Sequence, residues 1–376
     1  MTTITNVADL RELARRRVPR AFFEYADRGS YDESTLRENV RALERIKLRQ
    51  RVMIDVDRRN LATSFIGQPV SLPLAIAPTG LTGLQYGGGE ILGARAAAEA
   101  GIPFTLSTMS ICSIEQVAAA CDTPFWFQVY VMRDRGFTRE LIQRAHAAKC
   151  SALMLTVDLT IQGQRHREIK NGLAVPPKLT LRNAVDIMSK PRWAWNVLRA
   201  PSRSFGNLAG RIGGDSLTTL AQWIASQFDP TLSWADLAWI REAWPGKLII
   251  KGIMDPRDAK LAADHGVDAI VVSNHGGRQL DGAPASIDAL PAVVQEVGNR
   301  CEVLFDGGIT SGQALFKALA LGARGALMGK AFLYGLGAMG QPGVTAAIGI
   351  IAKELSTTMA LCGQTDVRAI SRDALW

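Results

Sequence analysis

Apolar residues gather along the chain in eight short runs, separated by longer stretches in which polar and apolar residues mix. The runs cover residues 74–78, 103–107, 125–130, 152–158, 247–252, 269–275, 302–308 and 325–332. Most are apolar without regular alternation, which is typical of strands buried on both faces. The pattern therefore predicts a parallel sheet covered by helices.

Helical patterns follow most of the predicted strands. Residues 89–101, 113–121, 138–149, 255–266 and 312–322 have helical patterns, and several of these segments stop at a glycine just before the next strand. Strand–helix units that return about every 20–30 residues predict an α/β fold of the (β/α)8 TIM-barrel type. A doubly wound sheet is the alternative, but the glycine-rich segment 79–90 lacks the dinucleotide-binding spacing.

The barrel pattern implies one domain over residues 1–376. We expect a helical cap over 1–70, with amphipathic helices at 7–17 and 34–46, the barrel over 71–340, and a helical segment over 341–376. A long gap separates Asp158 from Lys247, far longer than the other spacings between strands. It is therefore interpreted as an insertion after the fourth strand and not as a ninth unit.

Positive charge is concentrated in this insertion. The chain of 376 residues carries a formal charge of +8, and residues 178–214 hold seven basic side chains against one acidic one. Trp193 and Trp195 lie among them. Basic residues interleaved with tryptophan suit an anionic membrane surface, and a solvated surface loop is the alternative. Because the excess is local, nucleic acid is not an expected partner.

Cysteine usage and apolar run length indicate a cytoplasmic protein. The five cysteines are scattered and include no C-x-x-C pair, so we expect reduced thiols and no zinc site. The N-terminal residues have no apolar core typical of a secretory signal. By inspection, no run approaches the roughly 18 apolar residues of a membrane span.

Polar residues stand at the ends of the predicted strands, where the chemistry of a barrel collects. The strand ends supply Pro78, Thr79, Gly80, Ser107, Gln128, Tyr130, Thr156, Asp158, Lys251, Ser273, His275, Asp306, Gly307, Gly308, Gly329 and Lys330. A ring of this kind predicts a polar ligand over the barrel mouth. The glycine-rich turns at 306–312 and 322–332 follow the last two strands, where many barrels bind phosphate, and Lys330 adds a cation.

The charged residues among them suggest acid–base chemistry on a small carboxylate. His275 is the candidate base, Asp158 could orient it, and Arg165 and Arg278 could clamp a carboxylate. For each charge taken alone, a structural salt bridge is an equal alternative. These groups supply no electron sink, so a phosphate-bearing cofactor is expected. Lys251 could form a Schiff base with pyridoxal phosphate or place a cation beside flavin mononucleotide (FMN).

The segment SNHGGRQLDG at 273–282 closely resembles the signature of the FMN-dependent L-2-hydroxy-acid oxidases and dehydrogenases. Similar stretches run along nearly the whole chain, including FFEYADRGS, LAIAPTG, WFQVYVMRDR and MGKAFLYG. Among members, the chain is most similar to bacterial L-lactate dehydrogenases and next to mandelate dehydrogenases. The resemblance implies oxidation of an L-2-hydroxy acid to the 2-oxo acid, with L-lactate as the first candidate and L-mandelate or another larger acid as the alternative.

The resemblance also implies a role for each site residue. His275 would be the base with Asp158 as its partner, and Tyr25, Tyr130, Arg165 and Arg278 would bind the substrate. The flavin ring and ribityl chain would contact Pro78, Thr79, Gly80, Ser107, Gln128, Thr156, Lys251 and Ser273. The phosphate would be held by Asp306, Gly307, Gly308, Gly329 and Lys330.

Several positions bear on substrate, acceptor and cofactor binding. Thr310 and Lys330 stand where the family commonly has arginine, so the phosphate contacts are expected to differ. The loop after Asp158 lacks a proline that lactate enzymes usually carry. Gly80, where oxidases tend to have alanine, favours a quinone-linked dehydrogenase over an oxygen-using oxidase. The family also implies a homotetramer. We expect a cytoplasmic protein whose insertion could attach it peripherally to the inner face of the cell membrane. A non-catalytic basic binding protein is the rival of another class.

Overall fold

The structure is a computed structural model that describes residues 3–173, 180–208, 223 and 226–376. Eight parallel strands form its centre, in the order β3-β10-β9-β8-β7-β6-β5-β4. The strands are β3 (Leu74–Ile76), β4 (Thr105–Ser107), β5 (Trp126–Val129), β6 (Ala152–Thr156), β7 (Lys247–Ile253), β8 (Ala269–Val272), β9 (Glu302–Asp306) and β10 (Gly325–Met328). A parallel bridge between Ile76 and Phe104 joins the two outer strands, so the sheet closes into the predicted (β/α)8 barrel.

Side chains alternate between the two faces of each strand, which separates two apolar layers. The outward residues, such as Leu153 and Leu155 of β6, pack with the surrounding helices. The inward residues, such as Ala152 and Met154, fill the lower barrel together with Trp126. Every second residue of a strand points into the barrel. The inward residue at the carboxyl end of each strand therefore faces the barrel mouth.

A short hairpin closes the lower end of the barrel. Strands β1 (Thr63–Phe65) and β2 (Gln68–Val70) pair antiparallel, and Phe65 is fully buried against Trp126 with 6.3 Å between ring centroids. A Cβ on Gly325 would lie 2.4 Å from the Phe65 ring, so β10 needs glycine there. The hairpin was not predicted, because its strands are only three residues long.

Helices surround the barrel in the predicted positions, together with several that the sequence did not reveal. Those predicted are α4 (Gly89–Glu99), α5 (Ile114–Ala120), α6 (Arg135–Ala147), α12 (Pro256–Asp264) and α14 (Gly312–Ala320). Those not predicted include α11 (Asp236–Ala243) and α13 (Ser286–Val297), the second with a proline inside it. The strand prediction for 325–332 is wrong beyond Met328, because Lys330 already begins α15 (Lys330–Met339).

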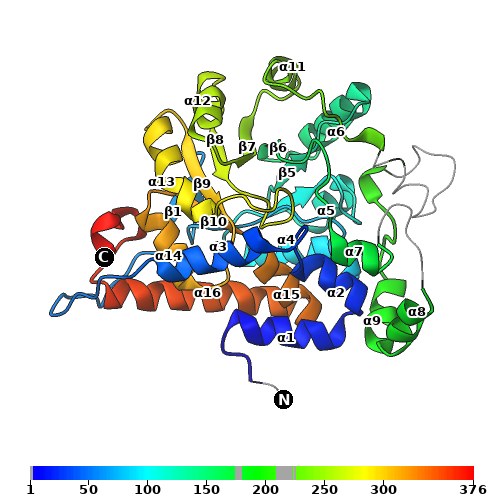
Figure 1. The fold of residues 1–376 in the computed structure, drawn as a ribbon, viewed down its shortest axis with the longest axis horizontal. Coiled ribbons are helices and arrows are strands. Elements are labelled where there is room, and N and C mark those ends of the chain that lie inside the picture. The colour runs from blue at the N-terminus through cyan, green and yellow to red at the C-terminus, as the bar shows by residue number, and fades with distance from the viewer. Residues whose placement is uncertain (1–2, 174–179, 209–222, 224–225) are drawn as a thin grey trace.

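The N-terminal helices form a cap along one side of the barrel. Helix α1 (Val7–Arg17) begins at an Asn6 capping box and packs on α15, and α3 (Ser34–Arg45) packs on α13. Helix α2 (Arg20–Asp27) lies between them, within the segment that links the two predicted helices. Figure 1 shows these helices in blue beside α15 and α16 in orange and red. The cap thereby reaches the edge of the barrel mouth.

Helix α16 (Gln341–Leu361) is long and apolar enough to cross a membrane by length and composition, which inspection of the sequence had not indicated. In the fold it packs on α14, α15 and α4. Its residues Val344, Ala347, Ile351 and Leu355 are fully buried. The helix therefore serves as a wall of the barrel domain.

Two short helices of the basic insertion lie beside the cap. The structure describes residues 180–208 of the segment 178–214, whose Lys178 and Arg211 lie outside the described residues. Helix α8 (Leu181–Met188) and helix α9 (Pro191–Leu198) contact each other, and α8 also contacts α2 (Figure 1). Trp193 stacks on Phe22 of the cap with 5.1 Å between ring centroids, which fixes α9 there.

Candidate active site

A cavity of about 1180 Å³ lies over the carboxyl ends of the strands. Its lining includes the predicted residues Tyr25, Pro78, Thr79, Gly80, Ser107, Tyr130, Arg165, Lys251, His275, Arg278, Asp306, Gly307, Gly308, Gly329 and Lys330. The other predicted residues, Gln128, Thr156, Asp158 and Ser273, each bond to or pair with a lining residue. The structure therefore brings the whole predicted set to one place.

Asp158 and His275 face each other across this mouth. The Nδ1 atom of His275 lies 2.9 and 3.1 Å from the two Asp158 carboxylate oxygens, which leaves Nε2 as the ring nitrogen for another partner. Three successive residues from 275 to 277 have left-handed backbone, with φ of 59°, 65° and 72°. Glycine adopts such angles freely, but in His275 they are strained, and backbone strain of this kind concentrates at functional sites. Here it turns the chain directly after β8 and places the imidazole at the cavity.

Burial and charge set the protonation of this pair. Burial, together with the positive charges of Lys251 and Arg165, lowers the pKa of His275 although the Asp158 carboxylate opposes this, so the imidazole is neutral at neutral pH. Burial would raise the pKa of Asp158, but His275 and Lys251 hold that pKa below its usual value. The site therefore pairs a neutral imidazole with a carboxylate, which is the state a general base needs.

Lys251 forms the centre of a second polar cluster. Its Nζ lies 2.8 Å from an Asp306 carboxylate oxygen and donates to the Ser273 hydroxyl at 3.0 Å. The same hydroxyl donates to Asp306 at 3.0 Å. Burial works against the charge, but Asp306 and Asp158 raise the pKa of Lys251 above its usual value. A permanent cation is therefore fixed on the inner wall, close to the Asp158–His275 pair.

Two arginines, the buried Arg165 and the largely buried Arg278, also line the cavity. Arg278 donates from its guanidinium to the carbonyl oxygens of Tyr25 and Arg28, and it stacks over the Tyr25 ring at 4.8 Å. Arg165 donates from Nε to the Arg278 carbonyl at 3.3 Å. The two guanidiniums thus lie together at one edge of the cavity. They can present parallel N–H donors to a carboxylate.

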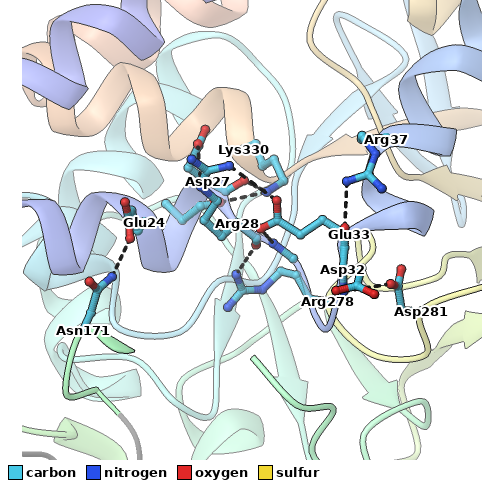
Figure 2. A network of polar contacts seen from close by, with 12 residues as sticks. Glu24, Asp27, Arg28, Asp32, Glu33, Arg37, Asn171, Arg278, Asp281 and Lys330 are labelled. Carbon is cyan, nitrogen blue, oxygen red and sulfur yellow. Dashed lines mark hydrogen bonds and ion pairs between the residues drawn. The ribbon is translucent and has the colours of Figure 1, made fainter. Parts of the chain in front are cut away.

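The glycine-rich turns line the same cavity. Gly307 and Gly308 have φ of 127° and 90°, values that side chains rarely adopt, and Gly329 precedes α15. Lys330 lies beside them, but its Nζ donates to the carbonyl oxygens of Ala26 and Asp27 at 3.0 and 2.7 Å. Figure 2 shows Lys330 within this network of the α2 end. Burial lowers the pKa of Lys330 to about 7.

Two site residues were missed by sequence reasoning. Glu168 of α7 (His166–Lys170) is buried and accepts from both Arg165 and Arg278. Gln279 donates to the carbonyl oxygens of Asp158 and Ile161, which fixes the loop after β6. The only signal for Glu168 was an acid three residues after Arg165, and that spacing is common on exposed helices. Gln279 lies within the signature segment at 273–282, but nothing in the sequence indicated which loop its side chain contacts.

A closed parallel barrel with a base, a buried cation and a glycine-rich turn at its mouth defines a cofactor-dependent enzyme of the TIM-barrel class. Residues 14–376 match the FMN-dependent dehydrogenase family. An L-lactate dehydrogenase of Caulobacter vibrioides is 48% identical over 375 residues, covering 99% of this chain and 97% of the relative. An L-lactate dehydrogenase of Ectopseudomonas mendocina is 45% identical over 99% of this chain and 98% of its own length. The chain belongs to the FMN-dependent dehydrogenase family.

Solved structures agree with this assignment. A structure described as the monotopic membrane protein (S)-mandelate dehydrogenase superposes with a TM-score of 0.94, at 34% identity and full coverage of both chains. A mandelate oxidase superposes with a TM-score of 0.84, also at 34% identity, over 100% of this chain and 98% of its own. The protein is therefore an oxidoreductase of a family whose members use FMN and act on 2-hydroxy acids.

The residues present fit FMN. The amide nitrogen Nε2 of Gln128 and the hydroxyl of Thr156 are buried and without a hydrogen-bond partner among the described residues. Buried polar atoms are rarely left unpaired, so a polar ligand is expected to satisfy them. Lys251 adds a cation on the same wall, and Gly307, Gly308 and Gly329 line the cavity, the last at the start of α15, where backbone N–H groups can bind a phosphate. The cavity therefore offers polar groups for a ring and backbone groups for a phosphate.

Proposed function

We propose that the protein oxidises an L-2-hydroxy acid, with L-lactate as the first candidate, to the 2-oxo acid. The observation that carries this proposal is the contact of 2.9 Å between His275 Nδ1 and Asp158 at the mouth of a cavity that the two arginines also line. This contact supports a role for His275 as a neutral base beside groups that would bind a carboxylate. The same residue types in isolation would be ordinary salt bridges.

Each of the candidate site residues has a defined role in the proposed reaction. Arg165 and Arg278 bind the substrate carboxylate, with the Tyr25 and Tyr130 hydroxyls beside it. His275 removes the hydroxyl proton through Nε2, and Asp158 stabilises the imidazolium that forms. FMN, when bound, would supply the acceptor for the α-hydrogen and the two electrons of its C–H bond. Lys251 supplies positive charge on the wall where negative charge then develops.

Replacement of the base tests the proposal. His275→Ala should still bind FMN and appear yellow, while reduction of the flavin by L-lactate slows by a factor of about 10² or more, the usual range for a lost general base. The measurement is anaerobic stopped-flow absorbance at saturating L-lactate. His146→Ala is the matched control, because His146 lies on α6 outside the cavity. Near-normal reduction by His275→Ala would remove the base assignment.

The choice of lactate rests on the relatives at 45–48% identity, whereas the solved neighbours are mandelate enzymes. The loop after Asp158 borders the cavity through Leu159 and Gln162. Comparison of kcat/KM for L-lactate and (S)-mandelate decides between them. A preference for mandelate by more than tenfold would make the larger acid the substrate.

We further propose that electrons pass to a quinone at a membrane surface. Leu181, Val185 and Met188 of α8 are 83%, 55% and 70% exposed, and Trp195 and Leu198 of α9 are 58% and 56% exposed. Their spacing places them on one side of each helix. Arg199 lies 4.0 Å from the Trp195 ring, and Arg182 and Arg192 are exposed. Apolar side chains flanked by cations suit an anionic bilayer interface.

The opposite side of α8 borders the active-site cavity. Asn183, Asp186 and Ile187 line it, together with Phe22 of the cap and Leu84. One short helix therefore separates the exposed apolar residues from the cavity. A quinone with its tail in the bilayer would need to reach past only this helix to bring its ring to the cavity mouth. This arrangement supports a quinone-linked dehydrogenase over an oxygen-using oxidase.

Vesicle binding tests the surface. The double variant Leu181→Glu and Met188→Glu should lose cosedimentation with anionic vesicles at low salt, while its activity with a soluble dye acceptor stays unchanged. Leu361→Glu, at a 58% exposed position on α16, is the matched control and should still bind. Equal vesicle binding by the double variant and the Leu361→Glu control would exclude α8 as the membrane-binding surface. Rapid reoxidation by air without any response to quinones would exclude the quinone itself.

The family resemblance also supports a homotetramer on the cytoplasmic face of the membrane. Size-exclusion chromatography with light scattering in detergent measures the subunit number directly. A monomer at micromolar concentration would contradict the tetramer without affecting the proposed chemistry.

A further inference from the structure

The most unusual group at the site is a protein carboxylate that lies between the two arginines. Glu168 Oε1 is 3.5 Å from Arg165 Nη1 and 3.0 Å from Arg278 Nη2. All three side chains are at most 13% exposed. The proposed reaction assigns both arginines to the substrate carboxylate. Glu168 thus already provides them with one carboxylate before any substrate arrives.

Without Glu168 the arginines would repel each other. Burial lowers the pKa of Arg165, and the positive charge of Arg278 lowers it further, whereas Glu168 raises it. Two buried guanidiniums with no shared anion would separate or turn toward solvent, because desolvated like charges are costly. A single carboxylate oxygen that accepts from both guanidiniums holds them close to each other.

The position of Glu168 is itself fixed by contacts to the cap. Asn171, at the end of α7, donates from its side chain to Glu24 of α2 at 2.6 Å. The His166 ring meets Tyr31 edge-on, with 5.7 Å between ring centroids. Arg165 precedes α7 and bonds to the Arg278 carbonyl. The short helix is therefore held at both ends, and Glu168 has a defined place between them.

We propose that Glu168 is a positioning residue that holds Arg165 and Arg278 at the separation needed to bind the carboxylate of the substrate. This inference rests on the proposed function, since it needs both arginines to face that carboxylate. Glu168, which itself lines the cavity, contacts Arg165 Nη1 and Arg278 Nη2, and in this proposal the N–H groups that it does not contact bind the ligand. Its effect therefore falls on anion binding and not on proton removal, which belongs to His275.

Oxalate binding to the FMN-loaded enzyme measures this effect without turnover. The change in flavin absorbance gives the Kd for wild type, Glu168→Ala and Glu168→Gln. We expect the alanine variant to raise the Kd about tenfold to a hundredfold, as for loss of a charged hydrogen-bond partner. The glutamine variant keeps an acceptor oxygen and should lose less. The KM for L-lactate should rise in parallel, with kcat within a few-fold of wild type.

Controls separate this role from general damage. Glu115→Ala removes a carboxylate that pairs with Arg144 on the outside of the barrel, and it should leave oxalate binding unchanged. If Glu168→Ala does not fold, the nearly isosteric glutamine variant still gives the answer.

Two results would overturn the inference. Unchanged oxalate affinity in both Glu168 variants would show that the arginines need no such support, and tighter binding would show that Glu168 competes with the ligand. A wild-type enzyme that binds no oxalate, and whose Arg278→Lys variant oxidises L-lactate normally, would instead overturn the carboxylate clamp and the proposed function with it.

Discussion

Asp158→Asn is the most informative single change, because it removes the charge that stabilises the imidazolium and keeps the size of the side chain. The carboxylate lies 2.9 Å from His275 Nδ1, and both side chains are less than 20% exposed. Leaving a charge without its partner at such a site costs about 3–5 kcal/mol. Each 1.4 kcal/mol or so is a factor of ten in rate. Flavin reduction should therefore slow by roughly 10²–10⁴.

The pH profile of this variant adds a second, independent expectation. Burial already lowers the pKa of His275, and Asp158 opposes that effect. Without the carboxylate the pKa of His275 falls further, and a base is active above its pKa. The acid limb of the reduction rate should thus move to lower pH while the plateau falls.

The assay is anaerobic stopped-flow reduction by L-lactate across pH. Asp281→Asn is the control, because Asp281 follows the same turn but accepts from Ser34 and Thr35 of the cap and does not line the cavity. It should keep the wild-type rate and profile. An Asp158→Asn enzyme with a normal plateau, or with an acid limb at higher pH, would refute the assigned partnership.

Two further predictions concern the cofactor end and the turn after β8. Because the pKa of Lys330 is lowered to about 7, the side chain loses its charge as pH rises above 7, and FMN affinity should fall. Lys330→Arg keeps its charge and should flatten this pH dependence, as measured by equilibrium dialysis. Parallel pH profiles for the two proteins would exclude Lys330 from phosphate binding. A Cβ on Gly277 would lie 2.5 Å from the Leu36 backbone nitrogen, so Gly277→Ala should lower the free energy of unfolding in urea by roughly 2–4 kcal/mol. A Cβ on Gly276 would lie in open space, so Gly276→Ala should lower it by only about 1 kcal/mol. Equal decreases in the two variants would contradict the close approach at Gly277.

The barrel was predictable from sequence because parallel buried strands leave a strong apolar signal. All eight predicted runs contain a strand of the sheet, and closure of the sheet confirms the fold class. Strand boundaries were harder to predict, since the mostly apolar residues 325–332 span the junction between β10 and α15. Helix α13 escaped notice because Pro291 interrupts its pattern. Short elements such as the β1–β2 hairpin carry too few residues for periodicity.

The site was predictable where chemistry coincides with strand ends. His275, Asp158 and Lys251 follow directly from that rule, and the structure brings them into contact or close to one another. Tyr25 came only from the family resemblance, because its position on the cap depends on tertiary packing. Glu168 was missed for the same reason. Lys330 was predicted as a phosphate ligand, and its bonds to the α2 carbonyls could not be inferred without the packing of the cap.

The hairpin beneath the barrel has a kinetic consequence. Because Phe65 and Trp126 block the lower end, both reactants of the proposed reaction, the hydroxy acid and the oxidant, would have to enter at the mouth. The two reactants would then use the same entrance and bind in turn. Turnover should accordingly follow a ping-pong pattern, with the oxo acid departing before the oxidant enters and with each reactant inhibiting competitively when supplied in excess.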